Sequence, residues 1–131
     1  QMRLDGAIPL LFKTLQLPSD PARYNACSAL SELAFRNEAN CSAIVHSNDG
    51  LASLMALMQG PVVDMQEDAT LVINNCAAFC EDVCPVIVAC PDMLRVLTQI
   101  ILHGECGAQR VAVGVINCLS RSAQARDALL A

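Results

Sequence analysis

The sequence repeats with a period of 43 residues. Similar stretches begin at Ala29 (ALSELAFRN), Val72 (VINNCAAFC) and Val115 (VINCLSRSA), and successive starts are 43 positions apart. A second pair, NCSAIV from Asn40 and VCPVIV from Val83, has the same spacing. Periods of about 40 to 47 residues are typical of stacked helical units, each of which buries its apolar face against its neighbours. The repeat therefore predicts an array of helical units.

Within each repeat, apolar residues recur with helical spacing. Leu51, Leu54, Met55 and Met58 fall at i, i+3, i+4 and i+7, which places them on one face of a helix. The same pattern begins at Ile8 and recurs, less completely, in the third repeat. These segments predict an all-α fold.

A break containing Gly or Pro follows each of these segments, at Pro18, Gly60 and Gly104, and a longer helical pattern follows each break. Asp20 and Asp64 lie at the start of two of the longer patterns. A carboxylate at this position can accept hydrogen bonds from the free N–H groups of the first turn. We therefore expect Asp20 and Asp64 to be N-caps.

The composition supports helices packed on helices and excludes two classes of partner. Hydrophobic residues make up 54% of the chain and aromatic residues only 3%, which favours an aliphatic helical core over a β-sandwich. The net charge is −5, and the eight Lys and Arg residues are scattered, so we expect no nucleic-acid partner. A membrane-spanning helix needs about 20 apolar residues in a row, and the sequence has no such run.

Most of the cysteines lie inside apolar helical patterns, where a free thiol behaves as a small hydrophobic side chain. A chain with so large an apolar fraction does not need disulfides to fold. We therefore expect free thiols and an intracellular location, cytoplasmic or nuclear. The eight cysteines are Cys27, Cys41, Cys76, Cys80, Cys84, Cys90, Cys106 and Cys118.

Metal and catalytic sites are weakly indicated. Cys76, Cys80 and Cys84 are spaced to share one helical face, but structural zinc sites use cysteine pairs on turns, so buried thiols are the better interpretation. His46 and His103 lie at expected helix ends, where a cation interacts favourably with the helix dipole. The sequence lacks phosphate-binding and nucleophile motifs. We expect no enzyme activity, no metal and no cofactor.

Several motifs resemble those of one repeat family. GAIPLL from Gly6 and ALSELA from Ala29 closely match the second and third helices of armadillo repeats, and NEAN from Asn37 matches the entry to the next first helix. VINNCA from Val72 is a looser match. The chain thus resembles the armadillo repeat family over nearly its whole length. The resemblance implies a right-handed superhelical solenoid of about three armadillo-type three-helix units.

In this register the chain is a single armadillo-repeat segment that starts part-way through a unit. It contains a partial unit over residues 1–36, full units over 37–79 and 80–122, and the start of a further unit over 123–131. Terminal units of solenoids normally carry a polar cap, and neither end of this sequence has one. We therefore expect an excerpt of a longer solenoid, or self-association through uncapped ends.

The resemblance also implies a binding surface. In armadillo arrays the third helices line a concave groove, and in importin-like members an Asn from each third helix clamps the backbone of an extended peptide beside a Trp. The Asn row of this chain is Glu32, Asn75 and Cys118, so only Asn75 matches, and the Trp row contains no Trp. A nuclear-import groove of the usual kind is therefore not expected.

Helical geometry and the 43-residue shift place further side chains in this groove. Tyr24 and Phe79 are the expected anchors, because aromatic residues dominate binding hot spots. Ser122 falls in the same row as Phe79, and a groove shared by Glu32 and Glu67 would favour a basic or neutral peptide. The predicted groove residues are Tyr24, Glu32, Arg36, Glu67, Asn74, Asn75, Phe79, Arg110 and Asn117.

These observations predict a protein–protein interaction scaffold that presents its groove to an extended or helical peptide segment of another protein. Two alternatives remain open. The segment could be a structural spacer within a larger repeat protein, in which case groove substitutions would change nothing. It could also be a thiol-based redox sensor, which requires at least one exposed thiol with a low pKa.

Overall fold

A computed structural model describes residues 6–130 of the chain. Within that range the protein is entirely helical and contains no strand, which confirms the all-α prediction. Residues 1–5 of the first predicted unit and Ala131 of the last lie outside the described residues. The elements are α1 (Ala7–Thr14), α2 (Asp20–Ala34), α3 (Glu38–Val45), α4 (Gly50–Met58), α5 (Val63–Phe79), η1 (Glu81–Val83), α6 (Cys84–Ala89), α7 (Met93–His103), α8 (Cys106–Arg121) and α9 (Ala123–Leu130).

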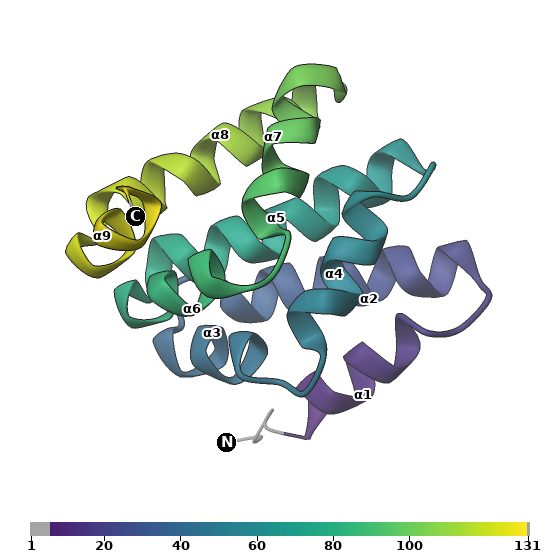
Figure 1. Ribbon diagram of the computed structural model, residues 1–131. Coiled ribbons are helices and arrows are strands. Elements are labelled where there is room, and N and C mark those ends of the chain that lie inside the picture. Colours follow the sequence, from purple (N-terminus) through teal and green to yellow (C-terminus); the bar gives the residue numbers. More distant parts are fainter. Residues whose placement is uncertain (1–5, 131) are drawn as a thin grey trace.

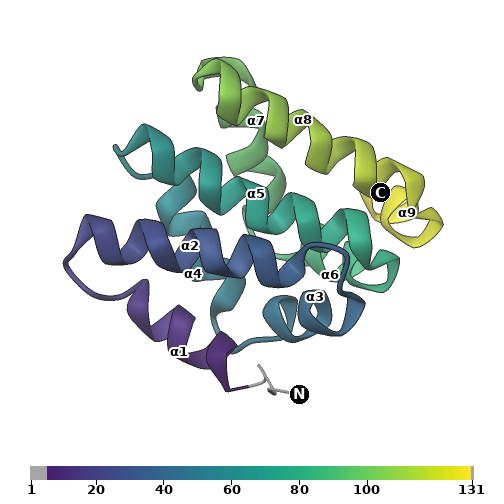
Figure 2. The ribbon, with the colours of Figure 1, turned by 180° about the vertical axis from the view of Figure 1, so that it is seen from behind.

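The three longest helices, α2, α5 and α8, lie side by side in chain order (Figure 2). The α5 helix packs against α2 on one side and α8 on the other. On the opposite face of the molecule, α4 and α7 lie in front of these helices, and the shorter helices α3, α6 and α9 gather near one end of them (Figure 1). Helix pairs α1–α2, α4–α5 and α7–α8 each pack together.

The core is the aliphatic interior that the composition predicts. Leu30 on α2, Ile73 on α5 and Leu119 on α8 are among its fully buried side chains. Burial of such a side chain contributes about 1.5–3 kcal/mol relative to leaving it in water. The long helices are therefore held in place by packing along their whole length.

Two glycines let α8 approach α5 closely. A Cβ atom added to Gly107 would lie 2.0 Å from Oε1 of Glu67, and one added to Gly114 would lie 2.8 Å from Oδ1 of Asn74. Both distances are shorter than a carbon and an oxygen tolerate. The side chains of Glu67 and Asn74 therefore lie directly against the α8 backbone.

The predicted N-caps are wrong by one or two residues. The cap of α2 is Ser19, whose Oγ accepts a hydrogen bond from the backbone N–H of Ala22 at 3.3 Å. Ser19 has the extended backbone that a cap needs, whereas Asp20 is already helical and pairs with Arg23. Helix α5 begins at Val63, so Asp64 lies in its first turn rather than at the cap.

The second helix of each of two repeats is preceded by an aspartate with a left-handed backbone. Asp49 has φ 59° before α4, and Asp92 has φ 69° before α7. Aspartate tolerates this conformation better than most residues with a side chain. The two aspartates are 43 positions apart, so the sequence repeat extends to the backbone geometry of this turn.

All eight cysteines are free thiols, in agreement with the prediction. Cys106 is exposed, and Cys90 and Cys118 are half-buried. The remaining five are buried. They therefore fill space in the core as small apolar side chains do.

Candidate protein-binding groove

A cavity of about 350 Å³ lies between α2 and α5, and it contains part of the predicted groove. Two of its lining residues, Glu32 and Asn75, were predicted from the repeat register. Ser28 and Leu71, which occupy the Trp row, also line it. The rest of the lining is formed by Ser31, Phe35 and Asp68.

Asn75 connects the two helices that form the cavity. Its Nδ2 donates to the backbone oxygen of Ser31 and to Ser31 Oγ, both at 3.0 Å. A side-chain amide has two N–H donors and one oxygen acceptor, so these bonds use its donors. The Oδ1 of Asn75 is the part of the amide that can still accept an N–H.

Asp68 brings an incompletely paired carboxylate to the cavity. Its Oδ2 is buried and has no hydrogen-bond partner among the described residues. Burial raises the pKa of Asp68, and the neighbouring charges of Glu67 and Asp64 raise it further. Together with burial, the charge of Asp68 also raises the pKa of the Cys27 thiol to about 12. The carboxylate is therefore a strong acceptor without a donor.

An aromatic pair lies at the carboxyl ends of the same two helices. The rings of Phe35 and Phe79 are 5.0 Å apart and meet edge to face at 73°. The guanidinium of Arg36 lies 5.3 Å from the centre of the Phe35 ring, within cation–π range. Phe35 lines the cavity, and two predicted groove residues, Arg36 and Phe79, lie against its ring.

The cavity also contains three candidate binding residues outside the predicted groove set, namely Ser31, Phe35 and Asp68. Ser31 directly precedes Glu32 of the Asn row in the sequence, but Phe35 and Asp68 were missed. The position equivalent to Phe35 in the next repeat is Ala78, so a comparison of equivalent positions does not mark Phe35 as a binding residue. Asp68 was missed because the 43-residue shift places Glu67, and not Asp68, in the same row as Tyr24 and Arg110.

The structure places the other predicted residues elsewhere. Glu67 and Asn74 face α8, against its glycines. Tyr24 on α2 and Arg110 and Asn117 on α8 are exposed and do not line the cavity.

Ser122 is not a groove residue, because its side chain is buried at the start of α9. Its Oγ accepts a hydrogen bond from the backbone N–H of Ala125 at 3.2 Å. The serine therefore caps α9, a role that a row of groove positions could not reveal.

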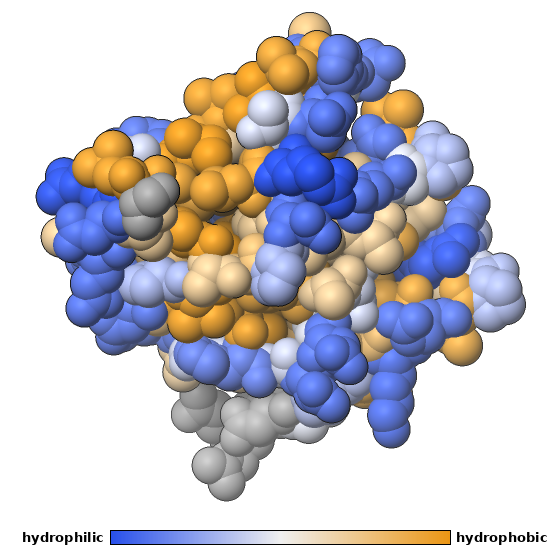
Figure 3. All heavy atoms as spheres, viewed as in Figure 1, coloured by the Kyte–Doolittle hydropathy of each residue, from blue (hydrophilic) through white to orange (hydrophobic). Residues whose placement is uncertain are grey.

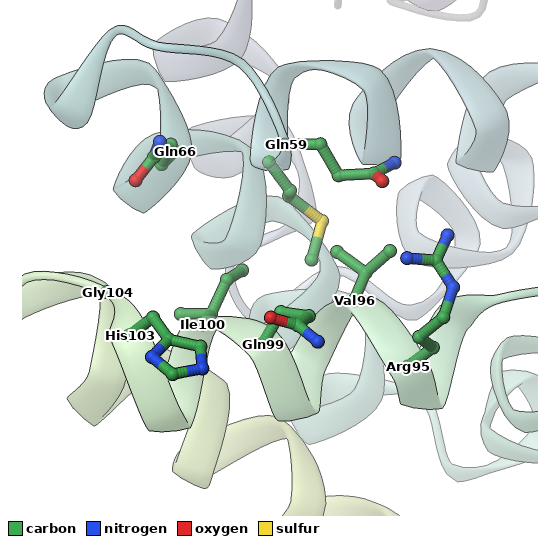
Figure 4. Close-up of a pocket in the computed structure, with 9 residues that line it drawn as sticks. Gln59, Gln66, Arg95, Val96, Gln99, Ile100, His103 and Gly104 are labelled. Carbon is green, nitrogen blue, oxygen red and sulfur yellow. The ribbon is translucent and has the colours of Figure 1, made fainter.

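A second cavity, of about 360 Å³, opens between α4 and α7 (Figure 4). Arg95, Gln99 and His103 follow one another along α7, and Gln59 faces them from the end of α4 (Figure 4). Gln66 on α5 lies beside them, and the lining includes no carboxylate. The apolar part of the lining is formed by Met58, Val96 and Ile100.

Metal binding and membrane insertion have little support within residues 6–130. In this part of the chain, no three His, Cys, Asp or Glu side chains are arranged to hold a metal ion. No single helix there is long and apolar enough to cross a bilayer, and the one adjoining pair with sufficient length and hydropathy, Val63–Phe79 with Glu81–Ala89, is bent by 117°.

Comparison with known proteins gave no match: no family model, no curated protein and no solved structure is significantly similar to this chain.

Proposed function

We propose that this chain is a protein-interaction scaffold of the armadillo type, in which the groove between α2 and α5 binds a peptide segment of a partner protein. Two kinds of support converge on this fold. The sequence repeats every 43 residues, and the long helices α2, α5 and α8, which follow one another in the same register, lie side by side. Stacks of this kind use their extended surfaces for binding.

The observation that carries the proposal is the cavity lined by Glu32 and Asp68. A buried acceptor without a donor is unfavourable, and a donor from a ligand would remove that cost. A Lys or Arg side chain of the peptide supplies such donors together with the opposite charge. Phe35 and Phe79 add apolar contact area next to the charged part.

Selection from a displayed library of disordered peptides tests this function. We expect the wild type to enrich peptides with a basic residue, and Glu32→Lys to lose them, because Glu32 is exposed and lines the cavity. Glu81→Lys is the matched control, since Glu81 is also exposed but lies on η1, outside the cavity. Enrichment that is equal in all three proteins, or absent from all, would contradict the proposal.

One observation favours the alternative of a spacer that stacks on further helices. Cys27 and Thr70, on α2 and α5, are 0% exposed, whereas the equivalent Val113 on α8 is 52% exposed. Apolar residues also gather over α7 and α9 (Figure 3). The two functions are compatible, and only the peptide-binding function predicts an effect of Glu32→Lys.

A thiol sensor has less support. The pKa of Cys41 is lowered by its hydrogen bond with Cys76, but Cys41 is fully buried. The exposed thiol is Cys106, on a different helix. The cysteine with the lowered pKa is therefore not the accessible one. A redox sensor needs a single thiol that is both accessible and of lowered pKa.

A further inference from the structure

We propose that the cavity between α4 and α7 is a second docking site, and that it binds an acidic peptide segment of a partner protein. The site is independent of the α2–α5 groove, because α4 and α7 lie on the opposite face of the molecule (Figures 1 and 2). No residue lines both cavities.

The charge of this lining is opposite to that of the protein. The chain has a net charge of −5, and Glu32 and Asp68 line the other groove. The α4–α7 cavity contains the positively charged Arg95 and no Asp or Glu, and the His103 imidazole adds an N–H donor. A positively charged lining repels basic ligands and attracts a ligand that carries carboxylates.

The donors of the cavity are arranged along α7. Arg95 and His103 are eight residues apart with Gln99 between them, so their backbone positions are separated by about 12 Å along the helix axis. Two acidic side chains four residues apart on an extended peptide are separated by about 13 Å. One extended segment can therefore present a carboxylate to each end of the cavity.

The hydrogen-bonding groups suit this ligand. Nε of Arg95 lies 3.4 Å from Oδ1 of Asp92, an exposed contact that leaves the terminal guanidinium nitrogens to bind a carboxylate. The amide of Gln99 is exposed and lies between Arg95 and His103 (Figure 4). Met58 and Val96 give the peptide backbone an apolar surface to lie on.

At about 360 Å³ the cavity is at the small end of the range of about 300–1,000 Å³ that small-molecule sites occupy, so its lining rather than its volume determines the occupant. The occupant is thus a segment with paired glutamates or aspartates. A scaffold with both sites would hold an acidic segment on one face and a basic segment on the other.

The test is fluorescence anisotropy at low salt with a labelled extended peptide in which two glutamates are separated by three residues. We expect saturable binding by the wild type, and at least about tenfold weaker binding by Arg95→Glu. Arg126→Glu is the matched control, because it changes the charge equally at an exposed position on α9. The same peptide with glutamine in place of glutamate should not bind.

Three results would overturn the assignment. They are no binding by the wild type, an equal loss in Arg95→Glu and Arg126→Glu, and full displacement of the peptide by millimolar inorganic phosphate, which would indicate a small-anion site. Glu32→Lys should leave this binding intact, so the outcome is separate from that of the α2–α5 groove. Circular dichroism of each variant checks that the helices are retained.

Discussion

The carboxylate of Asp68 couples the candidate groove to pH. Burial and the neighbouring acids raise its pKa above the ordinary value of 3.8, so the folded protein favours the neutral form. Protonation of Asp68 stabilises the folded protein. This stabilisation is fully present below the pKa that Asp68 has in the unfolded chain, and it is lost as the pH rises through the higher pKa that Asp68 has in the folded protein. At neutral pH, the ionised Asp68 therefore destabilises the folded protein.

We expect Asp68→Asn to raise the free energy of unfolding at pH 7, and the gain to disappear as the pH approaches about 3.8. Urea unfolding curves recorded at several pH values measure this difference. Asp127→Asn, which removes one carboxylate at an exposed position on α9, is the matched control. A constant difference between Asp68→Asn and the wild type would mean that the pKa of Asp68 is not raised.

The thiols give a second expectation at the scale of single residues. Under native conditions iodoacetamide should modify Cys106 first, because it is the exposed cysteine, and Cys76 among the last, because it is buried and its pKa is raised. Mass spectrometry of samples quenched over time gives the order. Modification of Cys41 as early as Cys106 would instead support the sensor function.

Sequence reasoning identified some residues of the candidate site and not others, for a physical reason. Glu32 and Asn75 were found because equivalent positions of a repeat share a face. The donor role of Asn75 toward Ser31 was not found, because it depends on the distance between two helices. Phe35 follows the last residue of α2, where the helical register no longer determines direction.

At the scale of helices, the sequence predicted more. Apolar periodicity and the Gly and Pro breaks predicted a fully helical chain, because both follow from local backbone geometry. The choice between Ser19 and Asp20 as a cap could not be made, since either side chain can accept the same hydrogen bonds and only the backbone angles decide.

The contact between α5 and α8 is sensitive to side-chain size. Gly114→Leu should lower the free energy of unfolding by about 1–3 kcal/mol, because the half-buried Asn74 has little room to move. Gly107→Ala should remain within about 1 kcal/mol of the wild type, since the long Glu67 side chain can rotate away and alanine favours the helix. Thermal unfolding of both variants measures the contrast, and equal losses would argue against this account.

For the whole molecule, the exposed face of α8 predicts association. Val113 is exposed where its equivalents are buried, and Leu102 on α7 and Leu130 on α9 are exposed as well. We therefore expect light scattering to show a mass that increases with protein concentration, and Val113→Glu to require at least about tenfold more protein for the same increase. Val63→Glu, an exposed position on α5, is the control. A constant monomer mass for the wild type would contradict the expectation.

The central place of α5 also determines how the molecule opens. It is the long helix with a long neighbour on each side, α2 and α8. In a stack of this kind the outer helices can detach while the rest remains folded, whereas α5 is exposed only after one of its two interfaces has been lost. Amide hydrogens of α5 should therefore be the slowest to exchange with deuterium. A peptide bound between α2 and α5 would slow exchange in those two helices and leave α9 unchanged.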